Sequence, residues 1–251
     1  MTRIAKAFEE KNLFIGYLTV GDSSLEFTKK AALALEKGGV DILELGLPFS
    51  DPVADGPVIQ EASVRALKNK TTPQDVLKVI KAIREKSEIP IVIMTYYNPI
   101  LKGGKSFLTQ AKKAGADGIL VVDLPLEEAA DYLKMMRSLK LDTIFLVTPN
   151  TSELRLMKIA NASTGFIYYA CQKGTTGMRA SLPKDLSKKI KQIKKVSSKP
   201  IAVGFGIKSK CDAKEILNIA DGFVVGSVFM DLIAKKGTLK QLQEIASKLK
   251  P

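Results

Sequence analysis

The sequence predicts an α/β fold, a (β/α)8 TIM barrel with an extra N-terminal helix. Its 251 residues are the usual length of one such barrel. Short apolar, β-branched segments alternate eight times with amphipathic segments, and right-handed crossovers close such doubly buried parallel strands into a barrel. No linker or shift in composition divides the chain. We therefore predict a single TIM-barrel domain over residues 1–251.

The alternative architecture is a doubly wound open sheet. Such a fold normally carries a glycine-rich nucleotide-binding turn after its first strand. The corresponding segment here, Val20-Gly21-Asp22-Ser23, matches that turn poorly. The barrel is therefore favoured.

The elements are predicted from apolar runs of strand length and from helix start and stop signals. A short helix over 2–10 precedes the first strand. Ser23 or Ser24 caps the helix that follows, and Gly38-Gly39 ends it. The predicted strands are 13–19, 41–45, 89–95, 119–122, 143–147, 165–169, 200–203 and 222–225. The predicted helices are 25–37, 57–68, 72–86, 105–113, 127–139, 152–161, a basic helix within 184–199, one opening at Ser209 or Asp212, and a final helix to about residue 248.

Composition excludes several classes of function. With 45% apolar and 26% charged residues, the chain is an ordinary globular one. It shows neither a signal peptide at its N-terminus nor a segment apolar enough to span a bilayer, so we expect a cytoplasmic protein without a membrane partner. The net charge of +13 comes mostly from lysines spread along the chain, which argues against nucleic acid and is compatible with an anionic substrate. There is no histidine, and Cys171 and Cys211 are far apart, so no metal site is predicted.

Two carboxylates mark the stretch LELGLPFSDPVADGP over residues 43–57. Glu44 lies inside an apolar strand, where an unpaired charge costs several kcal/mol and the pKa rises. Asp55 lies in a loop rich in turn residues that follows this strand. The strand end and the loop therefore place two carboxylates at one pocket, where acid–base chemistry is expected. The structural alternative is a buried Glu paired with an unseen Arg and an ordinary turn Asp.

The other chemical groups also fall where strands end, which is the working face of a barrel. The loops after the last two predicted strands carry glycines that let the backbone approach an anion, and a serine that opens a helix. Three of these residues are candidates for binding a phosphate group: Gly206, Gly226 and Ser227. Gly204 and Phe205, beside them, are candidate substrate-binding residues.

The stretch over 43–57 also resembles the signature of the tryptophan synthase alpha subunit. YYNP at 96–99, DLP at 123–125, GTTG at 174–177, GFGI at 204–207 and VGS at 225–227 extend the resemblance along essentially the whole chain. The resemblance implies a lyase of tryptophan biosynthesis, an indole-3-glycerol-phosphate lyase that forms indole and glyceraldehyde 3-phosphate. It also implies an α2β2 complex, in which indole passes through a tunnel to a pyridoxal-phosphate-dependent beta subunit while the alpha chain needs no cofactor.

The resemblance further implies roles for individual residues. Glu44 matches the general acid–base residue, and Asp55 matches the residue that accepts the indole N–H and stabilises the protonated indole. The positions that match substrate-binding residues are Tyr17, Met94, Tyr96, Val122, Leu146, Tyr168, Thr176 and Gly177, beside the phosphate candidates. For Met94 and Leu146 an ordinary place in the barrel core is an equal alternative.

The chain departs from the family pattern in two places. After Tyr168 the family commonly has Ser-Arg-x-Gly, whereas this chain has Cys171-Gln172-Lys173-Gly174, which puts lid closure and signalling to the beta subunit in doubt. Tyr17 stands where Phe is common, adding a hydroxyl to the pocket. Two alternatives remain: a lyase-impaired subunit that binds and activates the beta subunit, and another phosphate-binding barrel that uses different acids.

Overall fold

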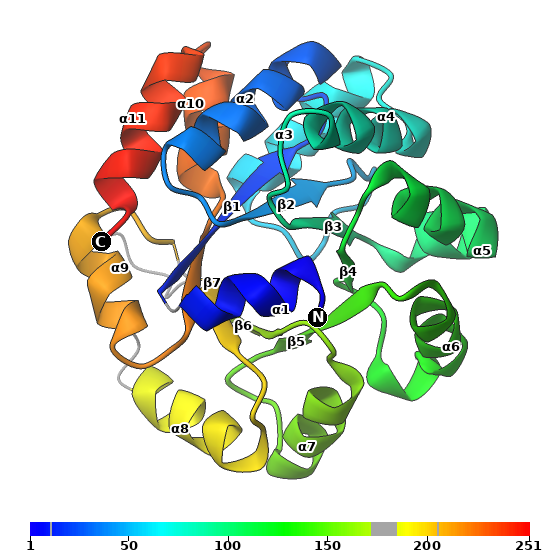
Figure 1. Ribbon diagram of the computed structural model, residues 1–251, viewed down its shortest axis with the longest axis vertical. Coiled ribbons are helices and arrows are strands. Elements are labelled where there is room, and N and C mark those ends of the chain that lie inside the picture. Colours follow the sequence, from blue (N-terminus) through cyan, green and yellow to red (C-terminus); the bar gives the residue numbers. More distant parts are fainter. Residues whose placement is uncertain (11, 172–184, 205) are drawn as a thin grey trace.

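The computed structural model describes residues 1–10, 12–171, 185–204 and 206–251. Parallel strands pair in chain order, and β8 pairs with β1, so the sheet closes into a barrel (Figure 1). The strands are β1 (Leu13–Thr19), β2 (Ile42–Gly46), β3 (Ile91–Thr95), β4 (Gly118–Val121), β5 (Asp142–Val147), β6 (Ile167–Ala170), β7 (Ile201–Gly204) and β8 (Gly222–Val225). The predicted (β/α)8 fold is confirmed.

Helices surround the barrel on its outer side, except for α1, which lies across one end (Figure 1). They are α1 (Arg3–Ala7), α2 (Leu25–Lys37), α3 (Pro57–Lys68), α4 (Pro73–Arg84), α5 (Tyr97–Ala114), α6 (Ala130–Leu139), α7 (Glu153–Ala162), α8 (Leu186–Val196), α9 (Lys210–Leu217), α10 (Ser227–Ala234) and α11 (Leu239–Leu249), with 3-10 turns η1 (Phe8–Glu10) and η2 (Leu126–Glu128). No helix in the described ranges is both long and apolar enough to cross a membrane.

The extra N-terminal helix α1 lies across one open end of the barrel (Figure 1). Its Ile4 is fully buried, and the ring of Phe8, which follows α1, packs 5.4 Å from that of Phe166. Ile4 belongs to the cluster of side chains that fills the barrel: Ile4, Leu13, Ile15, Ile42, Val92, Leu120, Ile144, Phe166, Ala202 and Val224. Helix α1 therefore closes the N-terminal end of the barrel and leaves the C-terminal end for a site.

Strand periodicity then decides which side chains reach that site. Successive side chains of a strand point to opposite faces, so residues two apart share a face. Ile42 packs inside the barrel, which directs Glu44 inward as well. On β1, Leu13 and Ile15 pack inside, which directs Tyr17 and Thr19 inward. The alternation thus brings polar groups into the C-terminal half of an otherwise apolar barrel.

Two predicted helices differ from the observed ones. Helix α5 begins at Tyr97 rather than near residue 105, and its two parts meet at Gly104, whose φ of 52° and ψ of −153° are not helical. The predicted final helix is two helices, because Lys236 adopts a left-handed φ of 57° and Thr238 caps a new helix in a capping box with Gln241.

Candidate active site

Glu44 lies on β2 inside the C-terminal half of the barrel and is 1% exposed. Its Oε1 has no hydrogen-bond partner among the described residues, and it forms no ion pair with any described Lys or Arg. Burial, and next the charge of Asp55, raise the pKa of Glu44 to about 8. A carboxyl group in this setting carries a proton near neutral pH and can both release and regain it.

Asp55 lies in the loop between β2 and α3, and its carboxylate is bound by the phenol of Tyr96. The Tyr96 hydroxyl donates a hydrogen bond to Oδ2 of Asp55 at 3.0 Å and accepts one from the Ala54 amide at 3.0 Å. Phe49 stacks on the Tyr96 ring with a centroid distance of 4.9 Å. Burial raises the pKa of Asp55 to about 6, and the Tyr96 hydrogen bond opposes that rise. Asp55 therefore ionises at a lower pH than Glu44.

Two tyrosines enclose the carboxylates. Tyr17 on β1 is the register partner of Glu44 on β2. Tyr168 lies on β6, which is four strands away from β2 around the ring of eight, so it faces Glu44 across the barrel. Burial raises the pKa of both phenols, and the charges of Glu44 and Asp55 raise it further. Both tyrosines are therefore neutral hydrogen-bonding groups at physiological pH.

Apolar side chains complete the mouth of the barrel. Met94 lies on β3, Val122 directly follows β4, and Leu146 lies on β5. All three are partly exposed and pack on the cluster that fills the barrel. The structure therefore brings them together above the core, on the side of the barrel between Glu44 and Tyr168.

The glycines predicted to bind the substrate lie at the ends of the adjacent strands β7 and β8 and in the loops that follow them. Gly204 ends β7 and pairs in register with Val224 on β8, and Ser227 begins α10 directly after Gly226. The first amides of this helix have no intrahelical partners, which favours an anion there. Three further predicted residues, Thr176, Gly177 and Phe205, lie outside the described residues.

Sequence reasoning missed three groups that shape the site. Phe49 stacks on the ring of Tyr96. Thr19 forms a hydrogen bond with the Tyr17 hydroxyl. Gly46 has no side chain, and the Tyr17 phenol occupies the position that its Cβ atom would take. Thr19 and Gly46 each stand two residues beyond a predicted site residue on the same strand, Tyr17 and Glu44. Period-two alternation was the signal that could have found them.

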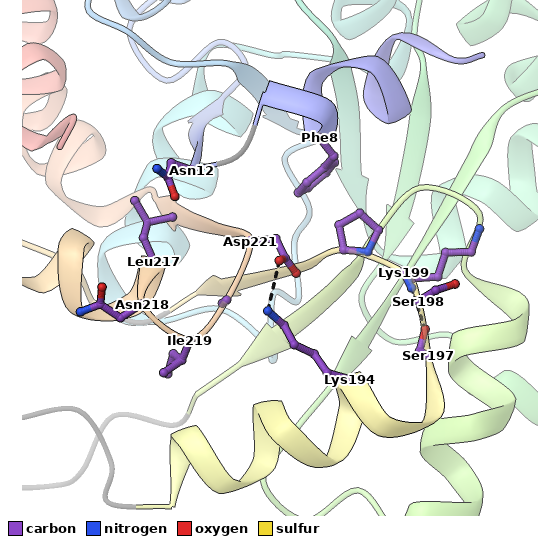
Figure 2. Close-up of a pocket in the computed structure, with 12 residues that line it drawn as sticks. Phe8, Asn12, Lys194, Ser197, Ser198, Lys199, Leu217, Asn218, Ile219 and Asp221 are labelled. Atoms are coloured by element: carbon purple, nitrogen blue, oxygen red, sulfur yellow. Dashed lines mark hydrogen bonds and ion pairs between the residues drawn. The ribbon is translucent and has the colours of Figure 1, made fainter.

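Figure 2 shows a separate pocket of about 530 Å³ at the N-terminal end of the barrel. Phe8 and the segments that precede β7 and β8 line it, and Lys194 pairs with Asp221 across it at 3.2 Å. The carboxylates of the candidate site lie at the other end of the strands, so this pocket is not part of it. In the described part of the chain, no three His, Cys, Asp or Glu side chains gather as metal ligands would.

A closed barrel whose C-terminal mouth holds one buried and one half-buried carboxyl group, both with raised pKa, defines a (β/α)8-barrel enzyme of the acid–base class. Comparison with known proteins then identifies the family. The model of the tryptophan synthase alpha chain family matches residues 4–250. The chain belongs to this family.

Similar proteins agree in sequence and in structure. The tryptophan synthase alpha chain of Coxiella burnetii (strain CbuK_Q154) is 49% identical over 100% of this chain and 98% of its own length. That of Chlamydia felis (strain Fe/C-56) is 46% identical, with coverage of 100% and 99%. A mutant tryptophan synthase alpha-subunit from the hyperthermophile Pyrococcus furiosus superposes with a TM-score of 0.89 at 39% identity, covering 95% of this chain and 98% of the other.

Proposed function

We propose that this chain cleaves indole-3-glycerol phosphate by a retro-aldol reaction, giving indole and glyceraldehyde 3-phosphate. Membership of the tryptophan synthase alpha chain family supports the reaction. The observation that carries the proposal is the environment of Glu44, a buried carboxyl with a pKa of about 8 that responds to the charge of a second carboxylate, Asp55.

Glu44 is proposed to move both protons of the reaction. Cleavage of the bond between indole C3 and the glyceryl chain requires a proton on C3 and loss of the proton from the adjacent hydroxyl. The protonated Glu44 carboxyl donates to C3, and the carboxylate so formed takes the hydroxyl proton as the carbon–carbon bond breaks. The bonding electrons return to the indole ring, an aldehyde forms, and Glu44 ends protonated as it began. A pKa near the working pH suits both steps.

Asp55 is proposed to stabilise the cation between these steps. Protonation of C3 places a positive charge on the indole ring nitrogen, and an ionised carboxylate that accepts the N–H lowers the energy of that cation. The Tyr96 hydrogen bond favours the ionised form of Asp55. The two carboxyl groups thus take different protonation states for different tasks.

The remaining site residues are proposed to bind the substrate. Tyr17, Met94, Tyr96, Val122, Leu146 and Tyr168 enclose the indole ring. Gly204, Gly206, Gly226 and Ser227 bind the phosphate with backbone amides, together with Phe205, Thr176 and Gly177.

The partner is proposed to be a pyridoxal-phosphate-dependent beta subunit in an α2β2 complex, in the cytoplasm. The alpha chain then works as one domain without a cofactor of its own, and its product indole passes to that subunit.

A lyase-impaired subunit that only binds and activates the beta subunit is the second candidate, suggested by Gln172-Lys173 in place of the usual arginine. Both carboxyl groups argue against it, because burial raises the pKa of each, and carboxyl groups with raised pKa are typical of catalytic sites.

The test measures indole release from indole-3-glycerol phosphate by the purified chain, with and without the beta subunit. We expect turnover that the partner raises. We also expect Glu44→Gln to abolish it, and Asp55→Asn to lower kcat by at least about a hundredfold. No turnover under either condition, with activation of the beta subunit on supplied indole, would establish the second candidate instead.

A further inference from the structure

The hydroxyl of Tyr17 is held by Thr19 rather than by Glu44. Tyr17 and Glu44 are register partners on β1 and β2, and both face the interior of the barrel. The Tyr17 hydroxyl lies 3.0 Å from Oγ1 of Thr19. Thr19 is 2% exposed and Tyr17 is 6% exposed, so water competes little for this hydrogen bond.

Gly46 shows where the phenol lies. Gly46 is the register partner of Thr19, and a Cβ atom built on it would lie 2.1 Å from the Tyr17 hydroxyl oxygen. The ring therefore reaches from β1 across the end of β2, over the position that a side chain at residue 46 would occupy. Glu44 stands two residues earlier on the same face of β2. The hydroxyl thus lies on the same face of β2 as Glu44, one inward-facing position further along the strand.

A freed phenol would have a better acceptor than a threonine hydroxyl. Oε1 of Glu44 has no hydrogen-bond partner among the described residues, and hydrogen bonds to an ionised carboxylate are stronger than those between neutral groups. Such a bond favours the ionised carboxylate and opposes its protonation. The reaction proposed above starts from the protonated form.

We infer that the phenol is the donor of the Tyr17–Thr19 pair. Thr19 is then a positioning residue that accepts the phenolic hydrogen, withholds it from Glu44, and so keeps the Glu44 carboxyl protonated for donation to carbon. The inference rests on the proposed function for its catalytic meaning. The hydrogen-bond arrangement itself is a property of the free protein. Thr19 then acts on the reaction through Tyr17, which is also one of the residues proposed to enclose the indole ring.

Other groups around Glu44 stay constant in the test. The charge of Asp55 acts on Glu44 and also on the Tyr17 phenol. The charge of Glu44 acts on Tyr168, which lies on β6 across the barrel, and Tyr96 acts through Asp55. The neighbour on β3, Val92, is apolar. Differences among variants of Thr19 and Tyr17 therefore report the Tyr17–Thr19 hydrogen bond.

The experiment titrates Glu44 in the free protein by infrared spectroscopy, with Glu44→Gln identifying its carboxyl band. Thr19→Val keeps the shape of the residue and removes the hydroxyl, whereas Thr19→Ser keeps the hydroxyl and serves as the matched control. We expect Thr19→Val to lower the Glu44 midpoint by about one pH unit, since the freed phenol binds the carboxylate. Thr19→Ser should leave the midpoint unchanged.

The double variant Thr19→Val with Tyr17→Phe decides whether the phenol carries the effect. We expect its midpoint to return to that of Tyr17→Phe alone. The inference would be overturned if the Glu44 midpoint of Thr19→Val equals that of the wild type. It would also be overturned if adding Thr19→Val to Tyr17→Phe lowers the midpoint as much as it does in the wild type. Because the titration needs no substrate, a failure of the inference is distinguishable from a failure of the proposed function, which indole release by the wild-type protein tests separately.

Discussion

The Tyr96 hydroxyl joins Asp55 to the end of β3: it donates to Oδ2 of Asp55 and accepts from the Ala54 amide, each at 3.0 Å. One phenol thus holds both the carboxylate and the backbone of the loop that carries it. A short side chain in a loop is otherwise free to point to solvent, so this contact determines where Asp55 lies. Phe49, from the same loop, holds the ring by stacking.

Tyr96→Phe removes this hydrogen bond and leaves the aromatic ring. Because the bond stabilises ionised Asp55, its loss should raise the pKa of Asp55 above about 6. We expect the acid limb of the pH profile of kcat/KM to move upward, and kcat/KM at pH 7 to fall about tenfold. Tyr97→Phe is the control, since it removes a neighbouring hydroxyl without touching Asp55. An acid limb at the same pH in Tyr96→Phe would show that the bond does not tune Asp55.

The pH profile of the wild-type enzyme follows from the two carboxyl groups. The proposed reaction needs Asp55 ionised and Glu44 protonated, so kcat/KM should rise as pH increases through about 6 and fall as it increases through about 8. These limbs belong to the pair, since the two groups interact. Asp55→Asn removes a charge that raises the pKa of Glu44. Infrared titration of Glu44 in that variant should therefore give a lower midpoint, and an unchanged one would refute the coupling.

Burial of Glu44 should also cost stability at high pH. Its pKa is about 8 in the folded chain against an ordinary value of 4.5, so between these values the folded state holds a proton that the unfolded state releases. Stability is then lost as pH rises above 4.5, and the loss is complete above about 8. Glu44→Gln does not titrate, so its free energy of unfolding should exceed that of the wild type by a few kcal/mol at pH 8 and by little near pH 4. Urea unfolding across this range measures the difference, and a pH-independent difference would contradict the shift.

The barrel and the position of Glu44 could be predicted from the sequence because both follow from local periodicity. An alternating order of strands and helices is compatible with only a few folds. A Glu within an apolar strand faces either the inside of the barrel or the surrounding helices, and is buried in both cases. The helix start at Tyr97 could not be predicted, because Pro99, Gly103 and Gly104 interrupt the helical pattern. The break near Gly237 could have been predicted, because Gly237 and the Thr238–Gln241 capping box mark the end of one helix and the start of the next.

The contacts between loops and strands were beyond sequence reasoning. Nothing local to Asp55 indicates that Tyr96, 41 residues away, binds it. The space that Gly46 leaves for Tyr17 likewise depends on strand register.

Gly204→Ala tests whether the end of β7 has to remain without a side chain. Its Cβ would lie 2.5 Å from the hydroxyl oxygen of Tyr168 and 2.7 Å from a ring carbon, so the ring has to move. Because Tyr168 faces Glu44 and overpacking costs about 1–3 kcal/mol, we expect kcat/KM to fall at least about tenfold. Gly165→Ala is the matched control at the opposite end of the barrel, where the nearest atom is 3.3 Å away.

Steady-state kinetics and urea unfolding of both variants separate an effect on the site from an effect on the fold. If Tyr168 moves as the contacts require, the free energy calculated from the fall in kcat/KM of Gly204→Ala should exceed the change in its free energy of unfolding. Gly165→Ala should keep the kcat/KM of the wild type. Wild-type kinetics in Gly204→Ala would mean that the position of the Tyr168 ring does not matter to the reaction. Equal kinetic losses in both variants would mean that any added methyl group disturbs the barrel, and that the site has no particular dependence on Gly204.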